Sequence, residues 1–80
     1  MTNELKRKAL ESILNATNDC VIAYNQYENN TDEEMNSIYE NIWSRKEDIL
    51  MGMRRLYKAT FDENAPRARS ELKYRIHNLT

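Results

Sequence analysis

This chain of 80 residues contains a single glycine, Gly52, and a single proline, Pro66. Glycine and proline are residues that tight turns often require, and the β-branched residues that strands favour are also few. A chain of this kind has few of the turn-forming residues that would connect many short helices or strands. The sequence therefore predicts an all-α fold built from a few long helices.

The length and the cysteine count limit how such a fold is stabilised. A domain of 80 residues buries only about 60–65% of the surface that its unfolded chain exposes, so small domains often rely on disulfides, a metal or a second subunit. Cys20 is the only cysteine, which excludes a disulfide within the chain. His77 is the only histidine and has no carboxylate at ligand spacing, so we expect no metal and no cofactor.

Apolar spacing and capping signals divide the chain into three helices over residues 3–28, 32–60 and 65–78, each bound being approximate. In the first helix, two neighbouring rows recur at steps of three and four residues, which is helical spacing. One row is Leu10, Leu14, Thr17, Val21 and Tyr24, and the other is Ile13, Ala16, Cys20, Ala23 and Tyr27.

The second helix has its own capping signal and its own seam. Thr31 with Glu34 forms a capping box, which predicts the start of this helix. The predicted seam is Met35, Tyr39, Ile42, Lys46, Ile49, Met53, Leu56 and Thr60, flanked by Trp43, Leu50 and Tyr57. Pro66 suits the first turn of a third helix with Leu72 facing inward. We expect one domain over residues 1–80: an antiparallel hairpin of two long helices plus a shorter C-terminal third helix, resembling a three-helix bundle.

Catalytic chemistry has little support in the sequence. Cys20 lies in an apolar row with no histidine nearby, which favours core packing over a nucleophile. The sequence marks no obvious catalytic relay around His77, and a surface histidine near a helix C-terminus explains this residue about as well as a general base. One glycine cannot form a phosphate-binding loop. The five tyrosines and Trp43 suit the margin of a core better than a platform for nucleobases. We therefore expect no enzyme.

The first residues lack the apolar run of a signal peptide, and no segment has the roughly 20 apolar residues of a membrane span. These features predict a cytoplasmic protein without a membrane partner. If the chain is encoded by a phage, the compartment is the cytoplasm of the host.

Charge is distributed unevenly along the chain. Residues 1–50 carry five basic and ten acidic side chains, whereas residues 51–80 carry seven basic and three acidic ones. The outward rows of the second helix are acidic before Met51, at Glu33, Glu34, Glu40, Glu47 and Asp48. The helix dipole acts within about a turn of a helix end, so it does not explain the acidic residues farther inside. We expect these five residues and Met51 to contact a partner; the alternative is an ordinary solvated face.

A second set of charged residues is basic. Arg54 and Arg55 continue the outward rows of the second helix, and Arg69, Lys73 and His77 recur every four residues on the third. A basic stripe of this kind is typical of a helix that contacts phosphates. Arg54, Arg55, Lys58, Arg69 and Lys73 are therefore the candidate contacts to nucleic acid or to an acidic partner.

Together these patterns predict an α-helical interaction protein that covers a surface of a larger macromolecule. Small chains rich in asparagine and tyrosine are typical of accessory proteins of phages and mobile elements. The expected target is a nucleic-acid-handling host protein, whose basic groove would receive the acidic rows, so that the chain inhibits or modulates it by occlusion. The alternatives are direct binding to DNA or RNA and a structural subunit of an assembly.

The first helix also suggests self-association. Between Ile13 and Tyr27 it presents apolar residues on more sides than one long and one short helix can cover. We expect a homodimer through Ile13, Cys20, Ile22 and Tyr27, centred near Ile22, because a two-fold contact buries the same patch twice. The alternative is a monomer in which the third helix folds back over this face.

Overall fold

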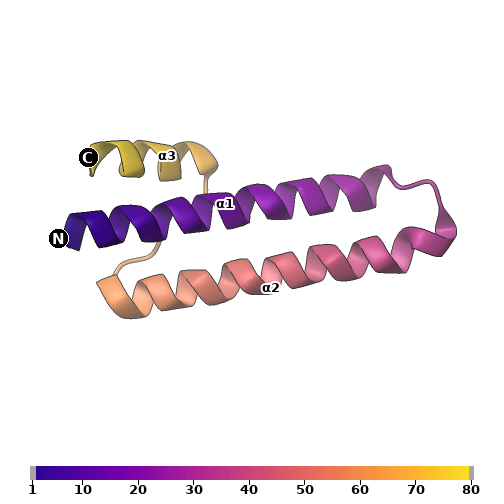
Figure 1. Ribbon diagram of the computed structural model, residues 1–80, viewed down its shortest axis with the longest axis horizontal. Coiled ribbons are helices and arrows are strands. Elements are labelled where there is room, and N and C mark those ends of the chain that lie inside the picture. The colour runs from indigo at the N-terminus through magenta and orange to yellow at the C-terminus, as the bar shows by residue number, and fades with distance from the viewer. Residues whose placement is uncertain (1, 80) are drawn as a thin grey trace.

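The computed structural model describes residues 2–79 and gives them four helical elements. These are α1 (Thr2–Asn29), the short 3₁₀ helix η1 (Glu33–Met35), α2 (Asn36–Phe61) and α3 (Arg69–Asn78), and none of the described residues lies in a strand. α1 and α2 form an antiparallel hairpin, and the molecule measures 48 × 22 × 15 Å (Figure 1). The predicted all-α fold, a long hairpin with a shorter third helix, is confirmed.

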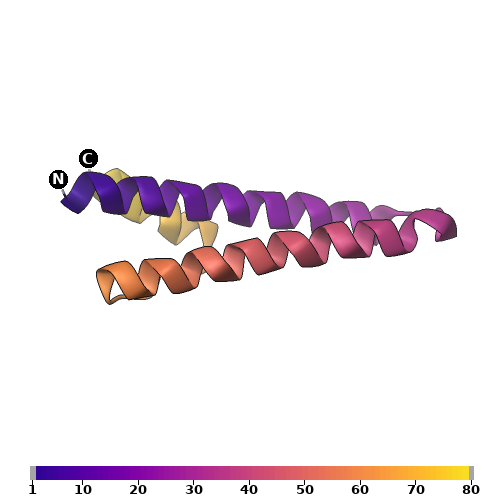
Figure 2. The ribbon, with the colours of Figure 1, turned by 60° about the horizontal axis from the view of Figure 1, so that its bottom comes forward.

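α1 is the central helix of the fold. α3 runs antiparallel to α1 and lies beside its N-terminal half, so that the two ends of the chain lie close together in both views (Figures 1 and 2). Within residues 2–79, no Cα atom of α3 comes within 8 Å of a Cα atom of α2. The arrangement therefore has α2 and α3 packed separately on α1, and residues 62–68 cross α1 between them.

The core lies where α1 meets both other helices. Leu10, Ile13 and Leu72 are the largest fully buried side chains, and α2 contributes Leu50 and Tyr57. Cys20 and Ala65 complete the cluster. These residues come from both ends of the chain, so the core joins α3 to the open end of the hairpin rather than to its turn.

The turn end of the hairpin is held by aromatic rings. The Trp43 ring stacks on that of Tyr27 with a centroid distance of 5.5 Å, and it meets Tyr24 edge-on at 5.0 Å. Such pairs contribute about 0.5–1.5 kcal/mol beyond their buried area. The expectation that the aromatic residues sit at the core margin holds for these three, because α3 does not reach this part of the hairpin.

The start of the second helix differs in detail from the capping box predicted at Thr31. The Asn30 side chain accepts a hydrogen bond from the Asp32 amide at 3.0 Å and donates one to the Asp32 carbonyl at 2.7 Å. This turn places Asp32 at the cap, where its carboxylate accepts from the Glu34 amide at 3.0 Å. The break was predicted correctly, but η1 occupies residues 33–35 and the α-helix begins at Asn36.

α2 is rotated relative to the predicted seam. Leu50 and Tyr57, expected as flanking residues, are the buried side chains of α2, whereas Ile42, Ile49 and Leu56 are 38%, 55% and 69% exposed. Aromatic side chains bury more area than aliphatic ones, so the row with Trp43 and Tyr57 gains more from facing α1. The predicted seam was wrong at these three positions. The observed orientation of α2 leaves them as an apolar row in solvent.

The third helix begins at Arg69, four residues later than predicted. α2 ends at Phe61, and Asp62 follows in the left-handed conformation with φ of 54°. Ala65 and Pro66 are buried in the crossing segment, and Ala68 is still extended with ψ of 135°. Pro66 therefore lies in the buried crossing segment instead of opening a helix. Leu72 faces inward as predicted, whereas Ala68 is exposed.

Candidate interaction surfaces

The acidic residues of the second helix remain in solvent, with one exception. Glu33, Glu34, Glu40 and Asp48 are exposed, and no basic side chain of the described chain lies within 4.0 Å of their carboxylates. We call these four residues the acidic surface. Met51, expected at the border between acidic and basic rows, is 48% exposed.

Glu47 is the exception among the predicted acidic contacts. It is half-buried, and its carboxylate accepts a hydrogen bond from the Trp43 indole Nε1 at 3.1 Å. Because the indole nitrogen is a donor that needs a partner when the ring is packed, Glu47 holds Trp43 in place against α1. Glu47 is thus occupied within the chain, which a pattern of outward charges does not reveal.

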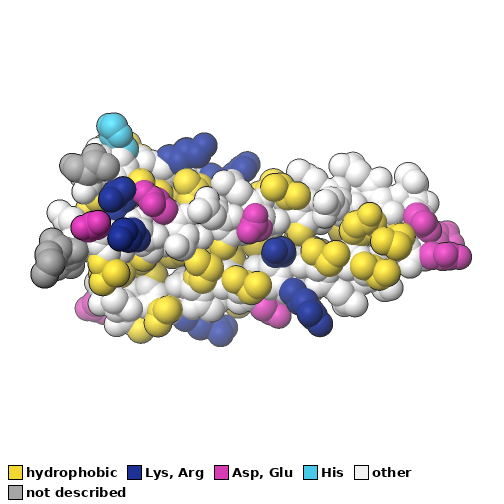
Figure 3. Space-filling view, viewed as in Figure 1, with side chains coloured by type: hydrophobic (Ala, Val, Ile, Leu, Met, Phe, Trp, Pro, Cys, Tyr) yellow, Lys and Arg dark blue, Asp and Glu magenta, His cyan; other side chains and the backbone are white. Residues whose placement is uncertain are grey.

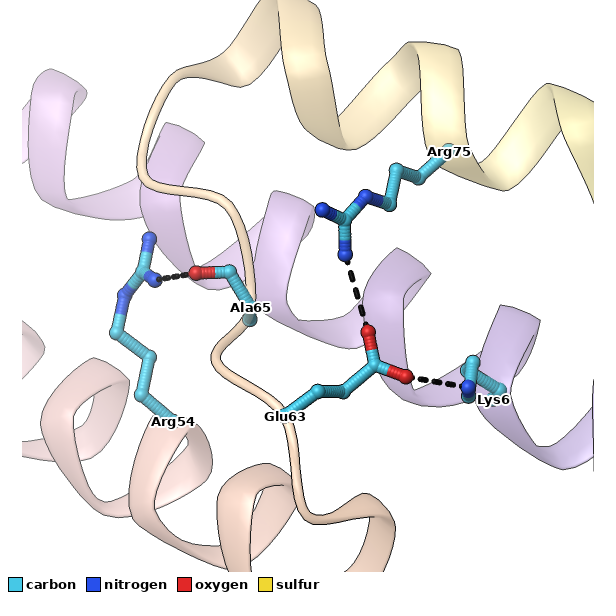
Figure 4. Close-up of polar contacts among 5 residues, drawn as sticks. All are labelled: Lys6, Arg54, Glu63, Ala65 and Arg75. Carbon is cyan, nitrogen blue, oxygen red and sulfur yellow. Dashed lines mark hydrogen bonds and ion pairs between the residues drawn. The ribbon is translucent and has the colours of Figure 1, made fainter.

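Arg54 is also committed within the chain. Its guanidinium donates one hydrogen bond to the Ala65 carbonyl and one to the Pro66 carbonyl, each at 3.0 Å (Figure 4 draws the first). Burial lowers the pKa of Arg54, and the nearby Arg67 lowers it further. Arg54 therefore joins α2 to the crossing segment, and it is not available as the phosphate contact that was predicted.

The other basic candidates do not form one patch. Lys58 lies 3.8 Å from Asp62, and Arg69 donates to the Asn18 side chain at 3.2 Å. Arg55 is exposed on α2, whereas Lys73 is exposed on α3, which packs on α1 away from α2. The structure does not bring the five predicted residues together on one surface.

The predicted dimer face on α1 is largely internal. Ile13 and Cys20 are 1% and 5% exposed because α2 and α3 cover them, so this part of the prediction was wrong. Tyr27 is half-buried against Trp43. Ile22 alone is open, at 57% exposure. Its neighbours one turn away on the helix surface are polar, at Asn18, Asp19, Asn25 and Gln26, as are those two turns away, at Asn15 and Asn29.

An apolar surface that the sequence did not assign lies along α2. Ile38, Ile42, Ile49 and Leu56 are all exposed, and we call them the α2 stripe. At Leu56 the stripe joins a groove of about 460 Å³ between the two long helices, whose walls include Leu5, Ala9 and Ser12 of α1. Figure 3 shows hydrophobic side chains in a broken row along these helices. Ile42, Ile49 and Leu56 were predicted as a buried seam, so their spacing was visible in the sequence but their exposure was not, and Ile38 was not assigned.

The expectation that Cys20 packs in the core is confirmed. Burial raises the pKa of its thiol, and the carboxylate of Glu47 adds to that effect. A thiol of this kind stays protonated and unreactive at neutral pH. Within the described part of the chain, no three or more His, Cys, Asp and Glu side chains are grouped as a metal site would require.

A cluster of ionic contacts at Glu63 ties three segments together. The Glu63 carboxylate pairs with Lys6 of α1 and, at 3.0 Å, with Arg75 of α3 (Figure 4). Glu63 and Arg75 are 12 positions apart and Glu63 lies outside the helices, so helical spacing does not reveal this pair. The hydrogen bond from Lys6 is the main cause that lowers the pKa of Glu63. Glu63 therefore stabilises α3 only in its ionised form.

This cluster predicts a pH dependence. A carboxyl whose folded pKa is depressed adds stability above its unfolded pKa, and that stability is lost as the pH falls through the folded pKa. We expect Glu63→Gln to lower the free energy of unfolding at about pH 7. Between about pH 7 and pH 3, the free energy of unfolding should fall less for Glu63→Gln than for wild type. Denaturant titrations at both pH values measure the difference. Glu71→Gln is the control, because Glu71 is exposed and has no ion pair within residues 2–79. Parallel losses for wild type and Glu63→Gln would contradict the assignment.

Comparison of the chain with protein-family models, with curated proteins and with solved structures gives no match. No described helix is both long and apolar enough to cross a membrane. Function therefore has to be inferred from the surfaces of this chain.

Proposed function

We propose that this chain is a non-enzymatic protein-interaction module whose acidic surface binds a basic groove on a nucleic-acid-handling protein and keeps nucleic acid out of it. The support is the lack of ion pairs at the acidic surface. Elsewhere in residues 2–79, Glu4, Glu11, Asp62 and Glu63 each lie within 4.0 Å of a lysine or arginine, whereas Asp19, Glu28 and Glu71 do not. The acidic surface differs from these three residues in gathering four such carboxylates within residues 33–48. A cluster of exposed carboxylates without partners attracts a positively charged surface and speeds its association.

Direct binding of nucleic acid by the chain has weaker support. Arg54, Lys58 and Arg69 each have a partner within the chain, at Ala65 and Pro66, Asp62 and Asn18 respectively. Arg55 and Lys73 lie on different helices, α2 and α3, which among the described residues have no Cα atoms within 8 Å of each other. Phosphate binding depends on several cations acting along one path, and the structure does not supply such a path from the predicted residues.

The experiment reverses charge on the acidic surface and compares it with the same change elsewhere. Glu33→Lys with Glu40→Lys should change the free energy of unfolding by only about 0–1 kcal/mol, because exposed charges contribute little. The double variant should weaken capture of nucleic-acid-binding proteins from a bacterial lysate by about tenfold or more. Mass spectrometry would identify them, and added double-stranded DNA should release them.

Asp19→Lys with Glu71→Lys is the matched control, since it makes the same change of charge at exposed positions on α1 and α3. This control should retain capture. Equal capture by both double variants would remove the acidic surface from the mechanism. Retention of a double-stranded DNA oligonucleotide by the chain itself at low salt, with steep loss as salt rises, would favour the nucleic-acid alternative.

A further inference from the structure

The chain exposes more surface than its size requires. Its accessible area is 5943 Å², whereas a folded monomer of 9.6 kDa typically exposes about 5,100 Å². The excess is comparable with the roughly 800 Å² that each partner buries in a stable interface. Four of the large exposed aliphatic side chains lie in the α2 stripe. A partner that covers part of the excess accessible surface is therefore expected to bind at this stripe.

The α2 stripe has the spacing of a coiled-coil seam. With the positions between them, its residues form one row at alternating steps of four and three: Ile38, Ile42, Arg45, Ile49, Gly52 and Leu56. All six are exposed. A row at this spacing presents a continuous edge to a second helix lying alongside. α1 meets a different side of α2, at Leu50 and Tyr57, so the seam has no helix on it within the chain.

We propose that the α2 stripe packs against the α2 stripe of a second copy, with the two α2 helices antiparallel about a two-fold axis. In the symmetric register, Ile38 faces Leu56 of the second copy, Ile42 faces Gly52, and Arg45 faces Ile49. A Cβ built at Gly52 meets no atom within 4 Å. The space over Gly52 therefore accepts the side chain of Ile42 from the second copy, and a two-fold contact of this kind closes without further growth.

Charge selects the antiparallel arrangement. Arg45 and Asp48 are exposed, and neither has an ion pair within the described chain. In the antiparallel register, Arg45 of each copy lies beside Asp48 of the other, which forms two symmetric pairs of opposite charge. A parallel dimer in register would place Arg45 against Arg45 at the seam, and like charges at such a position are destabilising.

The dimer is independent of the proposed function. At 3.6 residues per turn, Glu40 lies on the side of α2 away from the α2 stripe. Glu33 belongs to η1, before the paired residues 38–56. Both charges therefore stay accessible in the dimer. A dimer would then carry two acidic surfaces. Of the acidic surface, only Asp48 takes part in the dimer contact. Loss of the dimer would leave Glu33 and Glu40 as they are, and reversal of the Glu33 and Glu40 charges would leave the dimer intact.

Two substitutions with the same chemistry test the interface. Ile49 and Ile22 have nearly equal exposure, 55% and 57%, on different helices. We expect sedimentation equilibrium at micromolar concentration to give wild type twice the chain mass of 9.6 kDa. Ile49→Lys should weaken the dimer by about 100-fold or more and give the monomer mass, since each dimer loses two buried apolar side chains and places Lys against Arg45 of the second copy. Ile22→Lys should remain a dimer.

Circular dichroism serves as the folding control, because both residues are exposed and both variants should keep the helical signal of wild type. A wild-type chain that stays monomeric at high micromolar concentration would overturn the proposal, and the α2 stripe would then belong to another occupant. A dimer that survives Ile49→Lys but dissociates in Ile22→Lys would place the interface on α1 and would equally overturn the proposal.

Disulfide trapping tests the orientation. In a Cys20→Ala background, Ile38→Cys and Leu56→Cys variants are prepared separately and then mixed under oxidising conditions. The antiparallel register predicts a mixed disulfide between the two variants and little linkage of either variant with itself. Linkage of Ile38→Cys with itself would indicate a parallel dimer and contradict the register.

Discussion

Leu72→Ala should lower the free energy of unfolding by about 2–5 kcal/mol, the range for removing a fully buried leucine side chain. Leu72 is 0% exposed and is the only fully buried side chain of α3. A chain of 80 residues has a total stability on the order of 4–12 kcal/mol, so this loss is a large part of the whole. The cavity would open against Leu10, where α3 meets α1.

Urea denaturation followed by circular dichroism measures the loss. Tyr74→Ala, also on α3 but 67% exposed, should stay within about 0.5 kcal/mol of wild type, as surface changes usually do. Similar stabilities for Leu72→Ala and Tyr74→Ala would mean that α3 does not dock on α1 in solution. A transition of Leu72→Ala in two steps would instead show that α3 detaches before the hairpin unfolds.

Much of the fold was open to prediction because its causes are local. The first break follows from Asn30 and Asp32, whose side chains bond to nearby backbone groups and compete with the helix. Cys20 lies in a row of apolar residues at helical spacing, so its burial could be inferred from that row. Long helices in a chain with one glycine and one proline follow from composition.

The orientation of α2 could not be predicted in the same way. Two apolar rows run side by side on this helix, one through Leu50 and Tyr57 and the other through Ile49 and Leu56, and both have helical spacing. Periodicity fixes the angle between the rows, but it does not say which row meets α1. That choice depends on how side chains pack across the hairpin, which a single helix does not encode. The exposed row was consequently placed in the core.

Long-range polar contacts were missed for a related reason. Glu63 pairs with Lys6, 57 positions away in the sequence, and Arg54 bonds to carbonyls that lie 11 and 12 positions away. No spacing rule within one helix links such residues. Arg54 was therefore assigned to a partner surface on the basis of an outward row, although the fold uses it internally. Glu47 is a different case, because its partner Trp43 lies four positions away on the same helix, where a pairing can be foreseen.

Arg54→Leu should lower the free energy of unfolding by about 2–4 kcal/mol, because hydrogen bonds to a charged group contribute about 1.5–3 kcal/mol each and the abandoned acceptors add a penalty. Arg54 satisfies the carbonyls of Ala65 and Pro66 where the crossing segment is buried. Leucine keeps an apolar stem but offers no donor. Arg54→Lys should recover only part of the loss, since one ammonium does not reproduce the planar fork that reaches both carbonyls.

Arg55→Leu is the matched control for this loss. Arg55 is the next residue on α2, its side chain is exposed, and the substitution removes the same positive charge. Its free energy of unfolding should stay within about 0.5 kcal/mol of wild type. Hydrogen exchange adds a local readout, in which Arg54→Leu should lower protection at the first amides of α3 more than at the centre of α1. If Arg54→Leu has the stability and the hydrogen exchange of wild type, the Arg54 guanidinium does not stabilise the crossing segment. Arg54 would then again be a candidate contact to an external anion.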